Sequence, residues 1–197
     1  MLEEARRRGL LGPGPIHPHL AHALGFARAV GEPPAGTAVD LGSGGGLPGL
    51  ALALFWPTTR WVLLDAGQRR TAFLVEAVAE LGLGDRVEVL RGRAEEVGRE
   101  PDRRSRYALV VARSFGPPAV TAECAAPLLA VGGRLVVSEP PASAAPRWPA
   151  EGAEVLGLVP LAAVGEGSGS FQVLEQSAPC PGRFPRRPGI PHKRPLF

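Results

Sequence analysis

The sequence has no asparagine, one methionine, one lysine and only two cysteines, Cys124 and Cys180. Two cysteines are too few for a disulfide framework or a cysteine-based zinc site, so we expect two reduced thiols and no metal centre. The longest uncharged stretch, residues 41–59, holds five glycines and two prolines, which leaves its apolar part too short to cross a bilayer. Residues 3–8 are mostly charged, which argues against a signal peptide. These absences favour a cytoplasmic protein that does not contact a membrane.

Basic charge is concentrated in residues 181–197. This segment carries five basic side chains and no acidic one, whereas the rest of the chain carries 17 basic and 19 acidic residues. The formal net charge of +3 therefore comes from this segment. A short basic segment on a nearly neutral body suggests contact with a polyanion such as RNA. The alternatives are a solvated end or a segment that packs back on the fold. The candidate RNA-binding residues are Arg183, Arg186, Arg187, Lys193 and Arg194.

Hydrophobic runs and turn signals predict alternating strands and helices from residue 37 onward. Buried strands are predicted at residues 37–41, 60–64, 87–90, 107–112 and 134–138. Helical spacing of apolar residues predicts helices at residues 49–55, 68–83 and 119–129, with a turn or short helix at 94–97. Two closely spaced strands, near residues 154–159 and 170–175, indicate a hairpin.

This alternation predicts an α/β fold of the Rossmann-like type. We expect a mainly parallel, seven-stranded sheet with helices on both faces, to which the C-terminal hairpin adds an antiparallel strand. Residues 1–36 form a short helical lead before the sheet, with a helix expected at 20–30. Residues 37–180 form the main domain, and residues 181–197 form the basic tail.

A glycine-rich loop between the first strand and the first helix of the sheet is the strongest sign of a ligand site. Glycines in this position let the backbone turn sharply and approach a ligand closely. No Gly-Lys-Ser/Thr follows, which excludes a Walker phosphate loop. Asp40 precedes Gly42 and Gly44, and Asp65 ends the second strand, where a carboxylate can bind both hydroxyls of a ribose. This arrangement is typical of S-adenosylmethionine (SAM) methyltransferases, with Asp40 facing the methionine end; a nicotinamide cofactor is the alternative.

Charged residues follow the third and fourth strands at the same expected edge of the sheet. Glu95, in the segment after the third strand, is placed to lie near an adenine, and the alternative is a solvated residue of a first helical turn. Arg113 ends the apolar fourth strand, where a cation needs an anion such as the SAM carboxylate. The alternative for Arg113 is a surface ion pair.

Together these motifs resemble the RsmG (GidB) family of bacterial SAM-dependent methyltransferases. The resemblance extends from residue 8 to the C-terminal end. It is carried by Asp40-Leu-Gly-Ser-Gly-Gly-Gly-Leu-Pro-Gly49, Leu63-Leu-Asp-Ala-Gly-Gln-Arg-Arg70, Gly92-Arg-Ala-Glu-Glu96, Ala112-Arg-Ser-Phe115 and the segment from Arg183 to Leu196. The resemblance implies SAM contacts from Gly42, Leu47, Ala94, Glu95 and Arg113; Asp65 is added by the ribose argument.

The resemblance also implies a reaction: methylation of N7 of a guanine in 16S ribosomal RNA, or in a precursor of the small ribosomal subunit, with S-adenosylhomocysteine (SAH) as the product. Guanine N7 has an in-plane lone pair and carries no proton, so positioning supplies most of the catalysis. No acid–base pair is evident near the motifs, and we expect Arg113 to act by positioning, with a possible contact to guanine O6. No obligate protein partner is expected.

The segment before the glycine loop is short, and its region 16–22 holds three histidines but no tryptophan or arginine. Two other functions therefore stay open. The chain could be a diverged paralogue that methylates another RNA or a small molecule, or a protein that binds SAM without catalysis.

Overall fold

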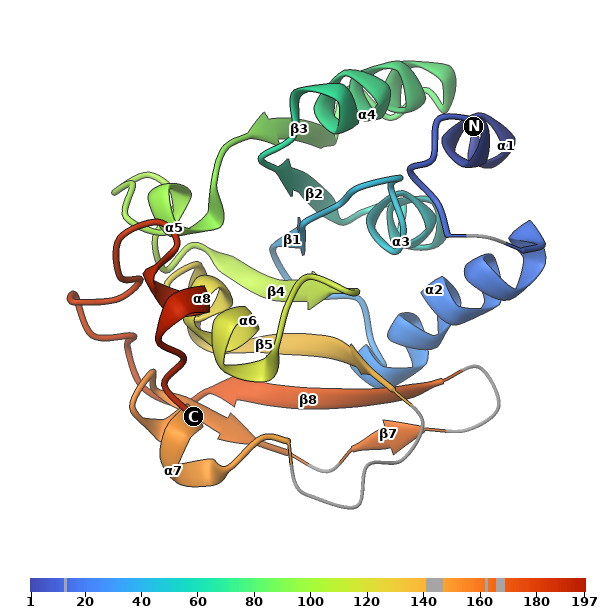
Figure 1. The fold of residues 1–197 in the computed structure, drawn as a ribbon. Helices are drawn as coiled ribbons and strands as arrows, with labels where there is room; N and C mark the ends of the chain where they lie inside the picture. Colours follow the sequence, from blue (N-terminus) through green and yellow to red (C-terminus); the bar gives the residue numbers. More distant parts are fainter. Residues whose placement is uncertain (13, 141–146, 162, 166–168) are drawn as a thin grey trace.

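The computed structural model describes residues 1–197 except 13, 141–146, 162 and 166–168. A single mixed sheet runs through the molecule and is covered by helices on both faces (Figure 1). Its strands are β1 (Thr37–Leu41), β2 (Arg60–Asp65), β3 (Val87–Arg91), β4 (Tyr107–Ala112), β5 (Leu129–Glu139), β6 (Leu158–Pro160), β7 (Val164–Gly165) and β8 (Ser170–Gln176).

The strand order is β3-β2-β1-β4-β5-β8-β6, and the short β7 pairs with β8. Strands β1 to β5 are parallel, whereas β8 runs antiparallel to β5, β6 and β7. The predicted α/β fold, with a parallel sheet and a C-terminal antiparallel strand, is confirmed. The order reverses between β1 and β4, and such a switch point opens a crevice at the carboxyl ends of the strands.

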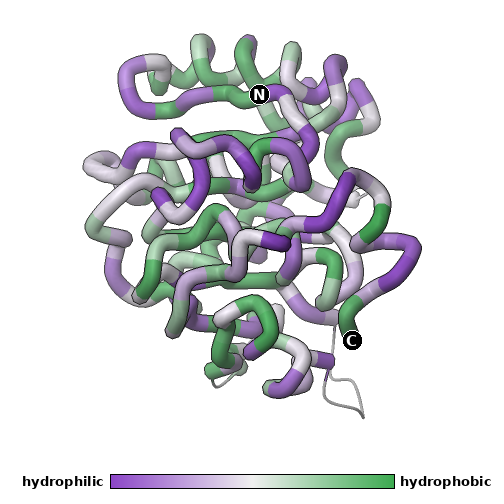
Figure 2. Tube along the Cα trace, turned by 90° about the vertical axis from the view of Figure 1, so that its left-hand side faces the viewer, coloured by the Kyte–Doolittle hydropathy of each residue, from purple (hydrophilic) through white to green (hydrophobic). Residues whose placement is uncertain are grey.

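The two faces of the sheet carry separate apolar cores because side chains alternate along each strand. On β2, Trp61 and Leu63 pack with one face, and Val62 and Leu64 pack with the other. The first face is covered by α1 (Leu2–Arg7), α2 (Ile16–Val30), α3 (Gly49–Phe55) and α4 (Gln68–Glu80). The second is covered by α5 (Ala94–Val97), α6 (Pro118–Ala125), α7 (Ala150–Glu154) and α8 (Ile190–Lys193). Figure 2 shows hydrophobic stretches through the middle of the molecule and hydrophilic ones on the outer turns.

Several element boundaries differ from those predicted. The helix expected at 119–129 ends at Ala125, and β5 already begins at Leu129, so Gly132 and Gly133 lie inside the strand. Of the strand expected at 154–159, only the end is extended, because α7 continues to Glu154 and β6 starts at Leu158. Helices α1 and α8 were not predicted. Among the described helices, none is long and apolar enough to cross a membrane.

Candidate functional site

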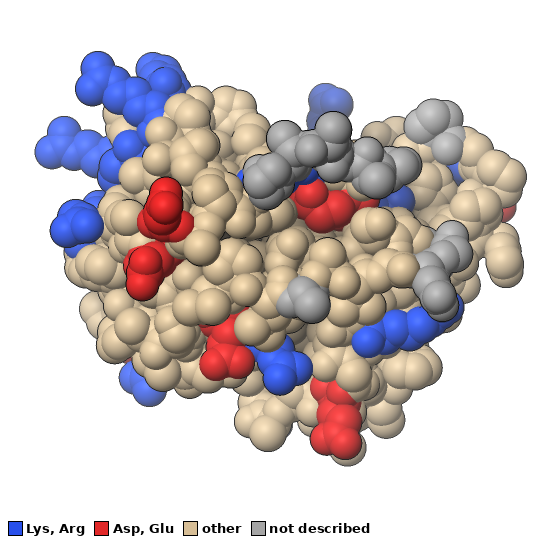
Figure 3. Space-filling model, turned by 90° about the horizontal axis from the view of Figure 1, so that it is seen from below, with Lys and Arg blue, Asp and Glu red and all other residues tan. Residues whose placement is uncertain are grey.

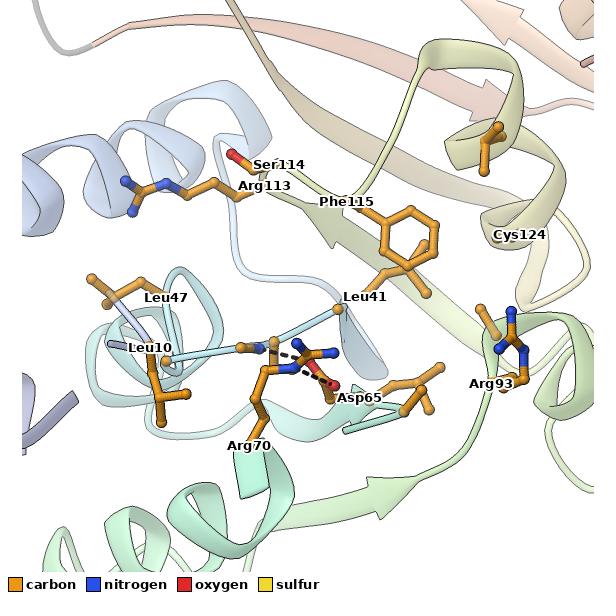
Figure 4. Close-up of a pocket in the computed structure, with 18 of the residues that line it drawn as sticks. Leu10, Leu41, Leu47, Asp65, Arg70, Arg93, Arg113, Ser114, Phe115 and Cys124 are labelled. Atoms are coloured by element: carbon orange, nitrogen blue, oxygen red, sulfur yellow. Dashed lines mark hydrogen bonds and ion pairs between the residues drawn. The ribbon is translucent and has the colours of Figure 1, made fainter. Parts of the chain in front are cut away.

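A cleft of about 750 Å³ lies at the carboxyl edge of β1, β2 and β4, where the strand order reverses (Figure 4). The sequence-predicted residues that line it come from four separate segments of the chain. They are Gly42, Gly44, Leu47, Asp65, Ala94, Glu95 and Arg113. The structure thus brings together every predicted cofactor residue except Asp40.

The glycine loop forms the floor of this cleft. The backbone N–H groups of Gly42 and Ser43 both donate to the carbonyl of Leu64, at 2.8 and 3.1 Å, which ties the loop to the end of β2. Gly42 has a φ of +75°, and a Cβ atom there would lie 2.6 Å from the ring of Phe115. Any other residue would be strained at this position and would displace Phe115.

Asp40 does not face the cleft, and the expectation that it contacts the methionine end of a ligand is corrected. Its side chain is buried under the loop, where Oδ2 accepts a hydrogen bond from the N–H of Gly49 at 2.9 Å. Burial raises the pKa of Asp40 to about 7, although the bond from Gly49 opposes the shift. Asp40 therefore fastens the start of α3 to β1, and it shapes the loop from beneath.

Asp65 lies in the cleft as predicted, but both of its oxygens already have partners. Oδ2 accepts from the N–H of Gly44 at 3.0 Å. Oδ1 accepts from the N–H of Gly67 and from Nε of Arg70, each at 2.7 Å. Arg70 was not predicted as a site residue, although its position five residues after Asp65 places it on the first turn of α4. Its side chain is about half exposed at 49%, so it can leave Asp65 at little cost.

At the other end of the cleft, Arg113 extends from β4 towards α2, away from Phe115 (Figure 4). Its Nη2 lies 2.8 Å from Nδ1 of His19, which accepts the hydrogen bond because the guanidinium can only donate. Burial lowers the pKa of Arg113, an effect that the charge of Asp40 opposes. His19 was not singled out from the sequence, where its only signal was its place among the histidines of residues 16–22.

Comparison with known proteins identifies the family. Residues 16–139 match the family model described as rRNA small subunit methyltransferase G. Proteins named ribosomal RNA small subunit methyltransferase G include one from Pelotomaculum thermopropionicum that is 34% identical over 185 residues, covering 90% of this chain and 77% of its own. One from Chloroflexus aggregans is 37% identical over 187 residues, covering 92% and 78%.

The chain belongs to the rRNA small subunit methyltransferase G family. The resemblance found in the sequence is confirmed. Solved structures agree on the fold alone. A protein of Corynebacterium glutamicum gives a TM-score of 0.57 at 21% identity, covering 89% of this chain and 87% of its own. An antibiotic-resistance methyltransferase gives 0.56 at 14% identity, covering 73% and 87%.

In this family member the basic tail packs against the second face of the sheet. Phe184 is buried in that core, and Arg186 pairs with Glu123, whose side chain is fully buried. Two nitrogens of Arg186, Nε and Nη2, lie 2.8 and 2.6 Å from the Glu123 carboxylate, and its backbone N–H donates to the same group at 2.8 Å. Arg104 donates to the carbonyls of residues 180, 181 and 184. These contacts agree with the alternative that the tail packs back on the fold.

The tail also reaches the cleft. The N–H of Gly189 donates to Oε1 of Glu95 at 3.0 Å, and Gly189 and His192 line the cleft. Burial alone would raise the pKa of Glu95, but the hydrogen bond from Gly189 and the charge of Arg93 outweigh it, and the pKa lies below its usual value. Glu95 is therefore ionised and held in place, so the tail completes one wall of the site.

The described residues contain no group of three or more metal-ligating side chains. Cys124 and Cys180 are both buried free thiols, and burial raises their pKa values.

Proposed function

We propose that the protein transfers a methyl group from SAM to N7 of a guanine in small-subunit (16S) rRNA, and that it does so in the cytoplasm. The observation that supports this most is the cleft at the switch point, lined by seven residues predicted to contact SAM, in a chain of the rRNA small subunit methyltransferase G family.

The lining of the cleft offers groups suited to each part of SAM. When bound, SAM supplies a methyl group on a positively charged sulfonium. Asp65 offers a carboxylate for the ribose once Arg70 releases it, and Ala94 and Glu95 would lie beside the adenine. Arg113 offers a cation for the SAM carboxylate, and Gly42 lets the ring of Phe115 pack against the loop.

The acidic groups of the cleft favour N7 as the target atom. Asp65 and Glu95 are both committed to hydrogen bonds with backbone N–H groups and arginines. Neither is a free general base, and guanine N7 needs none because it carries no proton. Alignment of the base with the methyl donor then becomes the main contribution of the protein.

For RNA, the supporting feature is the set of cations that the tail exposes. Arg183, Arg187, Lys193 and Arg194 are exposed, and Figure 3 shows Lys and Arg side chains gathered at one corner of the face seen from below. Arg186 is occupied by Glu123, so the proposal relies on the other four. Single-stranded RNA would offer them phosphates.

A methyl-transfer assay tests the function. Purified protein, radiolabelled SAM and undermethylated small-subunit rRNA should give labelled 7-methylguanosine after nuclease digestion and mass spectrometry. Labelling of another nucleoside, or of small molecules alone, would favour the diverged paralogue. Binding of SAM without any transfer would favour a protein that has lost catalysis.

Salt dependence tests the tail cations. Replacing Arg187, Lys193 and Arg194 together with glutamine should reduce the slope of log affinity for single-stranded rRNA against log salt by about 2, since each phosphate contact contributes roughly 0.7. SAM affinity should stay unchanged. Arg28→Gln, which removes an exposed cation of α2 outside the tail, is the control and should leave the slope unchanged. A slope that does not change in the triple variant would remove the tail from the RNA interface.

Asp65 and Arg70 allow a paired test of the cofactor site. Asp65→Asn should weaken SAM binding by about 1.5 kcal/mol or more, the contribution of a charge-assisted hydrogen bond. Arg70→Gln should leave SAM binding equal to or up to about fivefold tighter than wild type, because the partly exposed ion pair that competes for Asp65 contributes little. Calorimetry measures both, and equal affinity in Asp65→Asn would refute the ribose contact.

A further inference from the structure

A second cavity, of about 180 Å³, lies beside the cofactor cleft at the carboxyl ends of β4 and β5. The two cavities share Ser114 and Phe115, the residues that follow Arg113. Ser114 has a φ of +55°, a conformation that costs free energy in a residue with a side chain and that persists where the surroundings enforce it. The second cavity is therefore where a substrate group would meet a reactive group in the main cleft.

One carboxylate, Glu139, dominates this cavity. Glu139 ends β5, and its side chain is 14% exposed. Its Oε2 accepts from Nη1 of Arg147 at 2.6 Å, and its Oε1 accepts from Nε1 of Trp148 at 3.0 Å. These two donors fix the orientation of the carboxylate. A carboxylate has about four lone-pair sites, and the described residues supply one donor to each oxygen, which leaves a site on each oxygen for a ligand.

We propose that this cavity binds the guanine base that is methylated, with Glu139 accepting hydrogen bonds from its N1–H and N2–H₂ groups. The proposal rests on the proposed function. Two adjacent acceptors match two adjacent donors, and guanine is the RNA base with two neighbouring donors on its Watson–Crick edge. Adenine and cytosine have an acceptor nitrogen beside their amino group, and this nitrogen would be repelled by an oxygen of Glu139. Extruded bases are commonly recognised along this edge and stacked on aromatic rings, here Phe115 and Trp148.

This orientation also places N7 correctly. N7 lies on the five-membered ring, across the base from the Watson–Crick edge. A guanine whose Watson–Crick edge meets Glu139 therefore turns N7 towards Ser114 and Phe115, the boundary with the cofactor cleft. Methylation at N7 gives the base a positive charge, which the nearby carboxylate stabilises. Glu139 thus both selects guanine and favours the charged product.

Nucleotide binding tests the proposal without requiring catalysis. The full chain is saturated with SAH and titrated with the 5′-monophosphates of guanosine, inosine, adenosine and 7-methylguanosine, and quenching of Trp148 fluorescence is measured. Inosine lacks only the N2 amino group. We expect guanosine monophosphate to bind about tenfold more tightly than inosine monophosphate, which corresponds to one charge-assisted hydrogen bond. The 7-methylguanosine nucleotide should bind more tightly than both, and the adenosine nucleotide most weakly.

Variants assign these effects to residues. Glu139→Gln should bind the guanosine and inosine nucleotides equally and lose the preference for the methylated base. Glu151→Gln, on the exposed side of α7, is the matched control and should keep both preferences. In Trp148→Phe the quenching should disappear, because Trp56 and Trp61 are buried in the core of the opposite face.

Equal binding of the guanosine and inosine nucleotides by wild type, or discrimination that persists in Glu139→Gln, would overturn the proposal. So would the absence of quenching by guanosine monophosphate. If one of these results is found but the protein methylates small-subunit rRNA, the proposed function stands and only the base site is rejected. If Glu139 discriminates between the nucleotides but the protein does not methylate rRNA, the base site stands and the proposed function fails.

Discussion

The segments before β1 and after β8 reach the same cleft from opposite sides, and they hold it in different ways. Helix α2 contacts the cleft through a side chain, because Nδ1 of His19 accepts a hydrogen bond from Arg113 at 2.8 Å. The tail contacts it through the backbone, because the N–H of Gly189 donates to Glu95 at 3.0 Å. One wall of the cleft is therefore held by a side chain and the other by the main chain.

The anchors of the two segments differ as well. The segment around α1 is tied to α4 at the surface by two ion pairs, Arg8–Glu76 and the Met1 amino group with Glu80, and the side chains of Arg8, Glu76 and Glu80 are 39–62% exposed. The tail is held by Arg186 on the fully buried Glu123. Exposed pairs typically contribute at most about 1 kcal/mol, whereas breaking a buried pair costs about 3–5 kcal/mol. Both segments are rich in arginine, but the ion pairs around α1 contribute little to stability, whereas the Arg186–Glu123 pair of the tail contributes much more.

The largest effect should come from replacing Arg113, which His19 of α2 holds in place. Arg113→Ala is expected to lower kcat/KM for methyl transfer by about 100-fold, the usual loss when one preorganised charged donor is removed. Arg113→Lys should recover only part of it, because an ammonium cannot reproduce the planar fork. Thermal unfolding should show a melting temperature close to wild type. Full activity in Arg113→Ala would refute the role of this residue.

Breaking the buried pair of the tail should affect stability instead. Glu123→Gln is expected to lower the free energy of unfolding by about 3 kcal/mol, since Arg186 loses its charged partner. Urea denaturation measures this, with Glu76→Gln, which breaks the exposed pair with Arg8, as the control that should lose at most about 1 kcal/mol. Equal losses in both variants would mean that the two segments are anchored alike.

A smaller effect separates the positioning role of His19 from simple packing. His19→Leu removes the acceptor for Arg113 and should lower kcat by about fivefold, the contribution of one hydrogen bond. In His19→Asn the side-chain oxygen lies close to the position of Nδ1, so kcat should recover. If both variants have the same kcat, His19 does not position Arg113.

The smallest effect concerns His22 of α2 and the dependence of stability on pH. Burial lowers the pKa of His22 to about 4, helped by the charges of Arg113 and His19. The unfolded chain takes up a proton near pH 6.5 that the folded chain refuses, so His22 reduces stability as the pH falls from 6.5 towards 4. In His22→Leu this loss should vanish, and the melting temperature should depend less on pH between 6.5 and 5. His17→Leu, an exposed control, should behave as wild type.

The central elements could be predicted because their signals are local. Strands β1 and β4 and helix α3 have the predicted bounds. Prolines and the glycine cluster delimit β1 and α3, and β4 is an apolar run between Arg106 and Arg113. The cleft was predicted for the same reason: residues at the ends of parallel strands must meet at one edge. Gly42 and Asp65 needed no knowledge of distant contacts.

What could not be predicted depends on partners far apart in sequence. Arg186 and Glu123 are 63 residues apart, and Arg113 and His19 are 94 apart. Asp40 was misplaced because the pattern gives its position in the strand but not which face its side chain takes beneath the loop. The start of β5 was misplaced because Leu129 pairs with Tyr107, after which the register shifts and regular pairing resumes only at Arg134, close to the start predicted for this strand.

The lining of the cleft extends from Gly9 to His192. A ligand that binds only the folded protein raises its stability in proportion to the logarithm of ligand concentration. Here that gain requires both flanking segments to be docked, because detaching either one removes part of the lining. Bound cofactor should therefore slow proteolytic trimming at both segments together. The cofactor level of the cell would then influence how long each molecule keeps both segments intact.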